Sequence, residues 1–361
     1  MKIAFVVEHF QVRGGAERLE MILAEALDAD VYTGYVLNES FNLAHLRVKT
    51  VFRRMNSPLV RYFYQRRAFQ KIAADLANYD IVMYFGNCLD SAPFLPETVT
   101  KILYCHTPPR HVYADRDYYL KKFPWYIQPF YRFYTWMYRR NYEYLLTFMN
   151  CIISNSGNIQ NKLRKFTGHD SSIVYPPCNI NRFTWKGQSD YYLSFGRLEQ
   201  VKRVDLIAKA FTQMPDKKLI IASGGPELKK IQKIAAGHDN IIVKGLVSEE
   251  EILDLVGNCI ASIYVSVDED FGMGVTESLS AGKPVIASNE GAFPEIMTDK
   301  TGILLQETSV ESIIAAVRAL DAKEALTKKA DCIARAAKFS EENFLKGIKD
   351  IIKTYENRHH S

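Results

Sequence analysis

Short runs of apolar, often β-branched residues alternate with longer amphipathic segments along the whole chain. Each run covers three to six residues and ends at a polar or glycine-containing turn. This alternation is typical of βαβ units, in which helices cover both faces of a parallel sheet. The runs that predict strands are residues 2–7, 30–33, 81–84, 102–105, 151–154, 172–174, 191–195, 218–222, 241–244, 261–265, 284–287 and 302–305.

The series of strands is interrupted once. Two prolines at 176–177 are followed by a polar stretch at 185–190, and the strands then resume. This composition is typical of a linker, and 361 residues are enough for about two domains. We therefore predict an α/β protein with domains at 1–184 and 185–340. A last amphipathic segment, about 341–361, predicts a helix that the pattern alone assigns to neither domain.

Turns at the carboxyl ends of the strands are the places to look for chemistry, because ligands of open α/β sheets bind there. Two such domains facing each other would share one cleft. The first strand leads to Gly14 and Gly15, and a helix is predicted over 16–27. Glycines let backbone N–H groups approach a ligand, and a helix N-terminus favours an anion. An ordinary tight turn explains the pair equally well.

The second domain repeats this arrangement with added charge. Gly196 and Arg197 follow the first strand of that domain, and Lys202 comes five residues later, before a helix that is expected from about residue 204. Two cations at one strand end suit a diphosphate, although a solvated basic turn is the alternative. Gly224 lies in a further turn after a strand.

The most informative stretch runs from Asp268 to Leu279. Glu269 and Glu277 stand eight residues apart, one in the loop and one about a turn into the predicted helix. Two acids beside exposed N–H groups can accept hydrogen bonds from hydroxyl groups while the amides hold phosphate. Either acid alone is ordinary helix capping, but the pair with Phe271-Gly272 between them is specific.

Composition excludes several classes of protein. Forty-six basic and 41 acidic residues leave a net charge of +5, too weak a balance to indicate nucleic-acid binding. The six cysteines lack paired spacing, so we expect reduced thiols. No apolar run approaches the roughly 20 residues that span a bilayer, and Glu8 and His9 interrupt the first one. We expect no anchor or signal peptide and a cytoplasmic location.

Taken in order, these motifs closely resemble the retaining glycosyltransferases of family 4. The resemblance includes Gly224-Gly225-Pro226, Ala-Gly-Lys-Pro-Val-Ile-Ala at 281–287 and Phe293-Pro294-Glu295. It implies the GT-B fold, with two Rossmann-like domains facing across a cleft and a C-terminal helix crossing back to the N-terminal domain. Residues 104–110, Tyr-Cys-His-Thr-Pro-Pro-Arg, are similar to the subgroup with bacterial surface-polysaccharide mannosyl- and hexosyltransferases. Ala292 stands where many relatives have glycine, so its methyl group would restrict approach to the donor sugar.

The family resemblance also implies roles for individual residues. Arg197 and Lys202 would stabilise the departing diphosphate of a nucleoside-diphosphate sugar without a metal or other cofactor. Glu277 would accept hydrogen bonds from ribose hydroxyls and Glu269 from sugar hydroxyls, while His106 would contact the sugar near the reacting centre. GDP-mannose is the first expected donor, and a UDP-hexose is the second. The expected donor-binding positions are Gly14, Gly15, Gly196, Gly224, Val247, Asp270, Phe271, Gly272, Met273, Gly274, Val275 and Glu277.

Three alternatives remain open at this stage. Residues 115–117 and 268–270 each read Asp-x-Asp, the metal motif of the other glycosyltransferase fold. A sugar-nucleotide epimerase with the same fold would use the same donor residues for another reaction. A sugar-nucleotide-binding protein without catalytic activity is the third alternative.

Aromatic residues are concentrated in one segment of the N-terminal half. Fifteen of the 44 aromatic rings lie between residues 113 and 148, interleaved with six Arg and Lys residues. Such a mixture is typical of a membrane interface, but it is also compatible with helices whose rings form the core. The first interpretation predicts contact with anionic lipid and a lipid-linked glycan acceptor. Its candidate residues are Arg110, Trp125, Trp136, Arg139 and Arg140.

Overall fold

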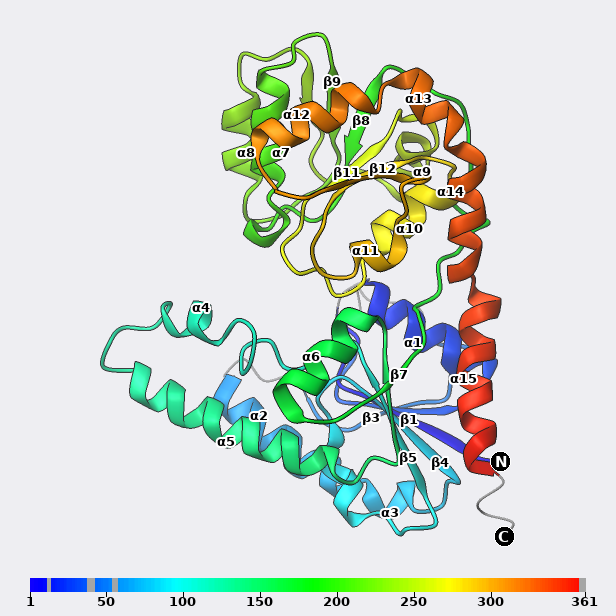
Figure 1. Cartoon of the computed structure of the whole chain (residues 1–361). Coiled ribbons are helices and arrows are strands. Elements are labelled where there is room, and N and C mark those ends of the chain that lie inside the picture. Colours follow the sequence, from blue (N-terminus) through cyan, green and yellow to red (C-terminus); the bar gives the residue numbers. More distant parts are fainter. Residues whose placement is uncertain (12–13, 38–42, 54–57, 357–361) are drawn as a thin grey trace. The chain divides into compact units, whose positions relative to one another are not determined.

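The computed structural model describes residues 1–11, 14–37, 43–53 and 58–356. Contacts divide the chain into two compact units (Figure 1). Unit 1 comprises Met1–Tyr175 together with Leu345–Ser361, and unit 2 comprises Pro176–Phe344.

The sheet of unit 1 has seven parallel strands in the order β3-β2-β1-β4-β5-β6-β7. Every residue of β1 and β4 is buried, because helices cover both faces of the central strands. The chain reverses its direction of winding between these two strands, which makes the point where they end the expected ligand crevice. The strands are β1 (Ile3–Val7), β2 (Asp30–Thr33), β3 (Val48–Thr50), β4 (Ile81–Phe85), β5 (Thr100–Cys105), β6 (Cys151–Ser154) and β7 (Ser172–Ile173).

Helices in unit 1 follow the carboxyl ends of the strands. Helix α6 illustrates the local signals: the Ser156 side chain accepts a hydrogen bond from the Ile159 backbone at its start, and Gly168 ends it with a φ of +75°. The helices are α1 (Gly15–Ala26), α2 (Pro58–Lys71), α3 (Ala73–Leu76), the 3₁₀ helix η1 (Leu89–Phe94), α4 (Arg116–Leu120), α5 (Gln128–Leu146) and α6 (Gly157–Thr167).

Unit 2 repeats the plan with six parallel strands in the order β10-β9-β8-β11-β12-β13. The winding reverses between β8 and β11, so the second expected crevice lies beyond these two strands. The strands are β8 (Tyr191–Ser194), β9 (Lys218–Ile221), β10 (Ile241–Val243), β11 (Ser262–Tyr264), β12 (Val285–Ser288) and β13 (Gly302–Leu305).

The core of unit 2 is built from apolar positions of these strands and of the helices that cover them, Ile207 and Phe211 of α7 among them. The helices that begin in unit 2 are η2 (Gln200–Lys202), α7 (Val204–Thr212), α8 (Leu228–Ala235), α9 (Glu249–Asn258), α10 (Met273–Ser280), α11 (Phe293–Ile296), α12 (Val310–Ala319), α13 (Ala322–Thr327), α14 (Lys329–Ala336), η3 (Ala337–Phe339) and α15 (Glu341–Glu356).

The predicted α/β class with two parallel sheets is confirmed. All twelve predicted strands are present within two residues of their expected ends, but β3 was not predicted. This edge strand reads Val-Lys-Thr and is largely exposed, so it lacks the apolar signal. Backbone pairing with β2 and the ion pairs of the preceding Arg47 to Asp28 and Asp30 hold it in place instead.

The division between the units falls earlier than the sequence indicated, after Tyr175 rather than after residue 184. The intervening residues pack within unit 2. The Cys178 backbone N–H donates to the Phe339 carbonyl at 2.7 Å, and the Phe183 ring is buried against Tyr191. Helix α15 is present over Glu341–Glu356, and its part from Leu345 belongs to unit 1, where the Tyr355 hydroxyl donates to the Asn150 carbonyl at 2.8 Å. Residues 357–361 of the predicted helix lie outside the described residues.

All six cysteines are free thiols, and all but Cys151 are buried. Burial raises the pKa of Cys259 to about 11 and that of Cys332 to about 12, so these thiols stay protonated and unreactive at neutral pH. In the described part of the chain, no helix combines the length and the apolar character needed to cross a bilayer.

Candidate functional site

The carboxyl end of β11 in unit 2 carries a close pair of opposite charges. Lys202 Nζ of η2 lies 2.6 Å from Glu269 Oε2 in the loop after β11, and the two side chains are 26% and 18% exposed. The pair therefore brings the cation expected to bind phosphate next to the carboxylate expected to bind sugar hydroxyls. Partial burial strengthens such a pair relative to one at the open surface.

Glycine geometry holds the loop of Glu269 against the segment after β12. Gly291 has a φ of +62°, and a Cβ atom there would lie 2.3 Å from the Glu269 backbone nitrogen. The next residue, Ala292, donates its N–H to the Glu269 carbonyl at 2.9 Å. Ala292 is fully buried, so its methyl group packs inside unit 2. The expectation that this methyl group restricts approach to a ligand is therefore wrong.

Helix α10 begins directly after this loop without a side-chain cap. Gly272 has a φ of +96°, and a Cβ atom there would lie 2.6 Å from the Phe293 ring. Gly274 allows equally close contact, because its Cβ would lie 2.3 Å from the Tyr264 hydroxyl. The first turn of α10 therefore packs tightly on unit 2 and leaves its backbone as the principal group to bind a ligand.

Two of the predicted donor-binding side chains contribute to the core instead. Phe271 is 4% exposed and packs on the Phe339 ring at 5.7 Å, and Val275 is fully buried. Any contact of these residues with a ligand must therefore be made by their backbone. Asp270, Met273 and Glu277 are half-buried.

The remaining predicted positions in unit 2 differ in exposure. Arg197 is 65% exposed and pairs with Glu199 at 3.1 Å, so it lies further out than Lys202. Gly196 is half-buried at the end of β8, and Gly224 lies where a Cβ would be 2.8 Å from the Leu246 side chain. Val247 is half-buried against an apolar cluster.

Arg203 belongs to the site region although its role was not predicted. It adopts the left-handed conformation with a φ of +49°, which is rare for a residue other than glycine. Its guanidinium donates to the Val265 carbonyl at 2.7 Å and to Glu290 at 2.5 Å. Arg203 thus ties the ends of β11 and β12 together, and its place in a run of basic residues concealed this role.

In unit 1, His106 follows β5 and is held by two neighbours. Its Nε2 lies 3.3 Å from Glu20 Oε1, and its carbonyl accepts a hydrogen bond from Asn155 at 3.0 Å. Burial raises the pKa of Glu20, while His106 opposes this increase. Glu20 was not predicted, although an acid between Leu19 and Leu23 on the buried face of α1 is a readable signal.

The carboxyl ends of β1 and β4 place Glu8 beside Asn87. The Asn87 backbone N–H points to Glu8 Oε2 at 3.4 Å, and Gly86, with a φ of +80°, leaves room for this carboxylate. Gly14 precedes the first turn of α1, and Gly15 begins that helix. Both glycines therefore lie in the segment that follows the carboxyl end of β1, where the sequence predicted them.

The aromatic segment divides between two environments. Nine of its fifteen rings are exposed, all within the described part of the chain, and Trp125 and Trp136 are 81% and 57% exposed. The exposed face of helix α5 carries Phe130, Phe133, Trp136 and Tyr144. Its other face directs Tyr131, Tyr134, Tyr138 and Tyr142 towards the rest of unit 1. The two interpretations of the sequence therefore each describe one face of the same helix.

The basic candidates of this segment differ in their partners. Arg110 pairs with Asp115 at 2.8 Å, and Arg139 pairs with Glu143 at 2.7 Å. Arg140 is exposed on the face of α5 that carries Trp136. Of the three, Arg140 is the cation best placed to meet a charged surface.

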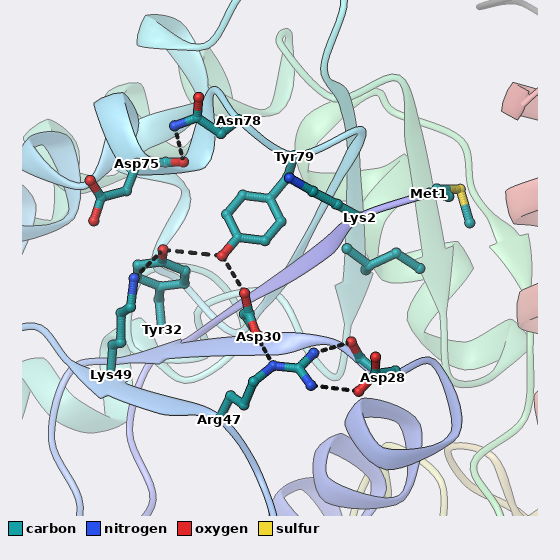
Figure 2. Close-up of a pocket in the computed structure, with 11 residues that line it drawn as sticks. Met1, Lys2, Asp28, Asp30, Tyr32, Arg47, Lys49, Asp75, Asn78 and Tyr79 are labelled. Carbon is teal, nitrogen blue, oxygen red and sulfur yellow. Dashed lines mark hydrogen bonds and ion pairs between the residues drawn. The ribbon is translucent and has the colours of Figure 1, made fainter.

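A hollow lies at the end of the unit 1 sheet opposite the carboxyl ends of the strands, and the side chains that line it bond to one another (Figure 2). Lys49 donates to the Tyr32 hydroxyl at 3.1 Å, and Tyr79 donates to Asp30 at 2.5 Å. Arg47 pairs with both Asp28 and Asp30 (Figure 2). This network joins β2, β3 and the turn before β4, and its side chains already pair with one another, so we assign no ligand to it.

One part of the chain matches the model of a known protein family. Residues 179–339 match the family model "Glycosyl transferases group 1". This segment contains Lys202, Glu269 and α10, whereas the match includes no residue of unit 1 up to Tyr175.

Individual proteins with sequence similarity to this chain are distant. An uncharacterized glycosyltransferase of Bacillus subtilis, YqgM, is 28% identical over 129 residues, covering 34% of this chain and 36% of the relative. A GDP-mannose-dependent phosphatidylinositol monomannoside mannosyltransferase of Mycolicibacterium smegmatis is 27% identical over 146 residues, covering 36% and 38%. The chain thus spans about a third of the length of these two curated relatives.

The fold extends over the whole chain. The crystal structure of Anabaena HepE in complex with UDP matches 98% of this chain and 100% of that chain, with a TM-score of 0.79 and 17% identity. This likeness shows that both units together have the GT-B fold.

Proposed function

We propose that this protein is a retaining glycosyltransferase that transfers a hexose from a nucleoside-diphosphate sugar to an acceptor hydroxyl. The observation that carries the proposal is the Lys202–Glu269 pair at the start of α10. It lies at the switch point of the unit 2 sheet and inside the segment that matches the glycosyl transferase family.

Catalysis in this proposal is electrostatic. As the bond between the anomeric carbon and the phosphate oxygen breaks, negative charge grows on the diphosphate. Lys202, Arg197 and the first-turn amides of α10 stabilise this charge, and preorganised donors of this kind are usually the largest catalytic contribution. The acceptor oxygen bonds to the anomeric carbon on the same face, and its proton passes to the departing phosphate oxygen. No protein nucleophile and no metal takes part.

The other polar residues orient the donor. Glu277 accepts hydrogen bonds from the ribose, and Glu269 accepts them from the sugar while keeping Lys202 in position. His106 contacts the sugar near the reacting centre, and Glu20 fixes the orientation of the imidazole ring. Within the described residues, no group of three or more His, Cys, Asp or Glu residues is arranged so that it could hold a metal ion.

The donor is GDP-mannose in our first proposal and a UDP-hexose in the second. The mycobacterial relative is named as dependent on GDP-mannose, which favours the first. The Anabaena structure contains UDP, which favours the second. The turn around Val247 would contact the base through its backbone, and a backbone contact of this kind does not reveal which base is bound.

A lipid-linked glycan is the proposed acceptor, met at the inner face of the cytoplasmic membrane. The exposed rings of α5 and of the segment before it are flanked by Lys121, Lys122, Arg132 and Arg140. Residues 116–146 carry six basic and two acidic side chains. Exposed Trp and Tyr rings insert at the headgroup level, and the cations attract anionic lipid.

A screen of nucleotide sugars tests this proposal. The purified protein is incubated in EDTA with GDP-mannose and a panel of UDP-hexoses, with and without a lipid-linked glycan fraction. We expect one donor to be consumed, with label passing to the lipid fraction and the anomeric configuration kept. Donor consumption that yields an epimeric nucleotide sugar without acceptor would indicate an epimerase. Binding without turnover of any donor would indicate a non-catalytic protein.

A further inference from the structure

Unit 1 contains a cavity of about 440 Å³ that has no role in the donor site. It opens between α2 and α5, which run side by side (Figure 1), and it reaches the carboxyl ends of β1 and β4 through Glu8 and Asn87. This volume falls in the range of small-molecule sites. Its lining residues are Glu8, Arg61, Tyr62, Gln65, Arg66, Asn87, Asp90, His111, Tyr119, Phe123, Tyr131, Tyr134, Tyr138, Asn141, Tyr142 and Leu145.

One wall of the cavity is a continuous set of aromatic rings. The Tyr62 ring of α2 lies 5.5 Å from Tyr134 and 4.9 Å from Tyr138, both on α5. His111 lies 4.9 Å from Tyr138 and meets it edge to face. These mutual contacts fix the rings in place, so they offer a rigid apolar surface to a ligand.

Charges in the wall balance one another. Arg66 donates to Asp90 at 3.0 Å and to Asn141 at 2.6 Å, and Asp90 is 3% exposed. The second cation, Arg61, shares the cavity with the carboxylate of Glu8. Burial lowers the pKa of His111, so its ring is neutral at pH 7. A wall without excess charge favours a neutral ligand over a phosphate or a carboxylate.

The wall also contains hydrogen-bonding capacity that the protein does not use. Asn87 Oδ1 and the Tyr62 hydroxyl are buried, and among the described residues neither has a partner of normal hydrogen-bond geometry. Buried polar atoms without a partner are uncommon in proteins, because each costs free energy until a partner is supplied. Small movements of these two side chains would present both to a hydroxyl-bearing ligand.

We propose that this cavity binds a pyranose ring of the acceptor glycan. A sugar ring is neutral, carries hydroxyl groups around its edge and presents C–H groups on its faces, which matches the balanced charges, the polar atoms and the aromatic wall. Glu8 ends β1, and β4 separates it from β5, which leads to His106. A sugar in the cavity therefore lies on the edge of the sheet that carries the proposed reacting centre. This inference rests on the proposed glycosyl transfer for its biological meaning, but not for its test.

Saturation-transfer NMR with simple glycosides tests the cavity without any donor. The probes are methyl α-mannopyranoside, methyl α-glucopyranoside and methyl β-galactopyranoside, each at millimolar concentration. We expect saturation to reach the ring protons of at least one glycoside. Gln65→Trp, which fills the cavity from α2, should abolish the signal. Tyr62→Phe should weaken binding about 2- to 10-fold, the cost of one neutral hydrogen bond.

Tyr64→Phe is the matched control, because Tyr64 lies two residues away on α2 and does not line the cavity. Circular dichroism and thermal melting establish that each variant is folded. Saturation of no glycoside, or a signal that survives Gln65→Trp, overturns the inference. Binding of inorganic diphosphate in place of the glycosides also overturns it. Normal glycoside binding in a protein that binds no nucleoside diphosphate would leave the cavity assignment standing and remove the proposed function.

Discussion

The sites at the two switch points of this molecule are built from different parts of the protein. In unit 2, the site consists of loops whose backbone is fixed by glycines, with Gly291 and Gly272 in conformations that other residues rarely adopt. In unit 1, the corresponding edge is lined by side chains of two long helices, α2 and α5. A diphosphate common to many donors suits a fixed backbone cradle, whereas an acceptor particular to one pathway suits side chains that can vary.

The two sites also differ in whether comparison with known sequences detects them. The family match spans residues 179–339 and therefore the unit 2 site. The aromatic helix α5 lies outside it. Changes at the first site should affect donor binding and turnover, and changes at the second should affect the acceptor and the membrane.

The largest effect is expected at Lys202. Lys202→Ala removes one preorganised cation from the developing diphosphate, and turnover should fall about 10² to 10³-fold. Arg197→Ala should fall in the same range if both cations act together. Steady-state rates of sugar transfer measure this, with Lys209→Ala on the exposed side of α7 as the control. Near-normal rates in both Lys202→Ala and Arg197→Ala would exclude the phosphate clamp.

Gly291→Ala tests whether the unit 2 loop depends on backbone geometry. A Cβ atom would lie 2.3 Å from the Glu269 nitrogen in addition to the strain of a positive φ. We expect the free energy of unfolding to fall by about 2–3 kcal/mol. Gly237 also has a positive φ, +80°, but a Cβ atom there would meet open space. Gly237→Ala should therefore lower the free energy of unfolding by only about 1 kcal/mol. Equal losses in urea unfolding would show that contact with the Glu269 loop does not matter.

Charge reversal on α5 tests the membrane surface of unit 1. Each basic residue near an anionic surface contributes about 1 kcal/mol, so Arg132→Glu with Arg140→Glu should weaken liposome binding about 30-fold or more. Sedimentation with phosphatidylserine vesicles at two salt concentrations measures this. Lys229→Glu with Lys233→Glu on α8 makes the same change of charge in unit 2. If the α8 variant loses as much binding as the α5 variant, the attraction is not specific to the aromatic face.

Glu20→Gln should have a smaller effect, about 10-fold on turnover, because it misorients His106 without removing it. Ionised Glu20 accepts a hydrogen bond from His106, and acid removes this bond by protonating the carboxylate. Because burial raises the pKa of Glu20, the loss should begin at a higher pH than for an exposed glutamate. The glutamine variant should lack this acid limb in its pH–rate profile. An unchanged profile would leave Glu20 a purely structural role.

The smallest effect concerns a buried lysine in unit 2. Lys283 donates to the Gly187 carbonyl and lies 3.4 Å from the Trp185 ring centre, and burial lowers its pKa from 10.5 to about 8. Between these two pH values the unfolded chain binds more protons than the folded one, so folding becomes more favourable as the pH rises. Wild-type stability should gain about 1 kcal/mol over Lys283→Met between pH 7.5 and pH 9. No change in this difference by chemical denaturation would contradict the lowered pKa.

The sequence predicted the buried framework and the glycine-rich turns, because these depend on local patterns. Strands such as β1 and β4 are continuous apolar runs, and the turn around Gly272 has no plausible alternative residue. It did not predict β3, whose order comes from a neighbouring strand. It also did not show which rings of α5 are buried and which are exposed, because Tyr134 and Tyr138 pack on Tyr62, more than 70 residues away in the chain. Contacts between distant helices leave no mark on either sequence segment alone.

Calorimetric titration with UDP and GDP tests the central claim, that unit 2 binds the donor and the unit 1 cavity does not. Wild type, Lys202→Ala and Gln65→Trp are compared side by side in EDTA. We predict that wild type binds one of the two nucleotides, that Gln65→Trp binds it equally well, and that Lys202→Ala binds it at least about 10-fold more weakly, as the loss of a charge-assisted contact requires. Absence of binding of either nucleotide to wild type, or its loss in Gln65→Trp with Lys202→Ala unaffected, would contradict the account.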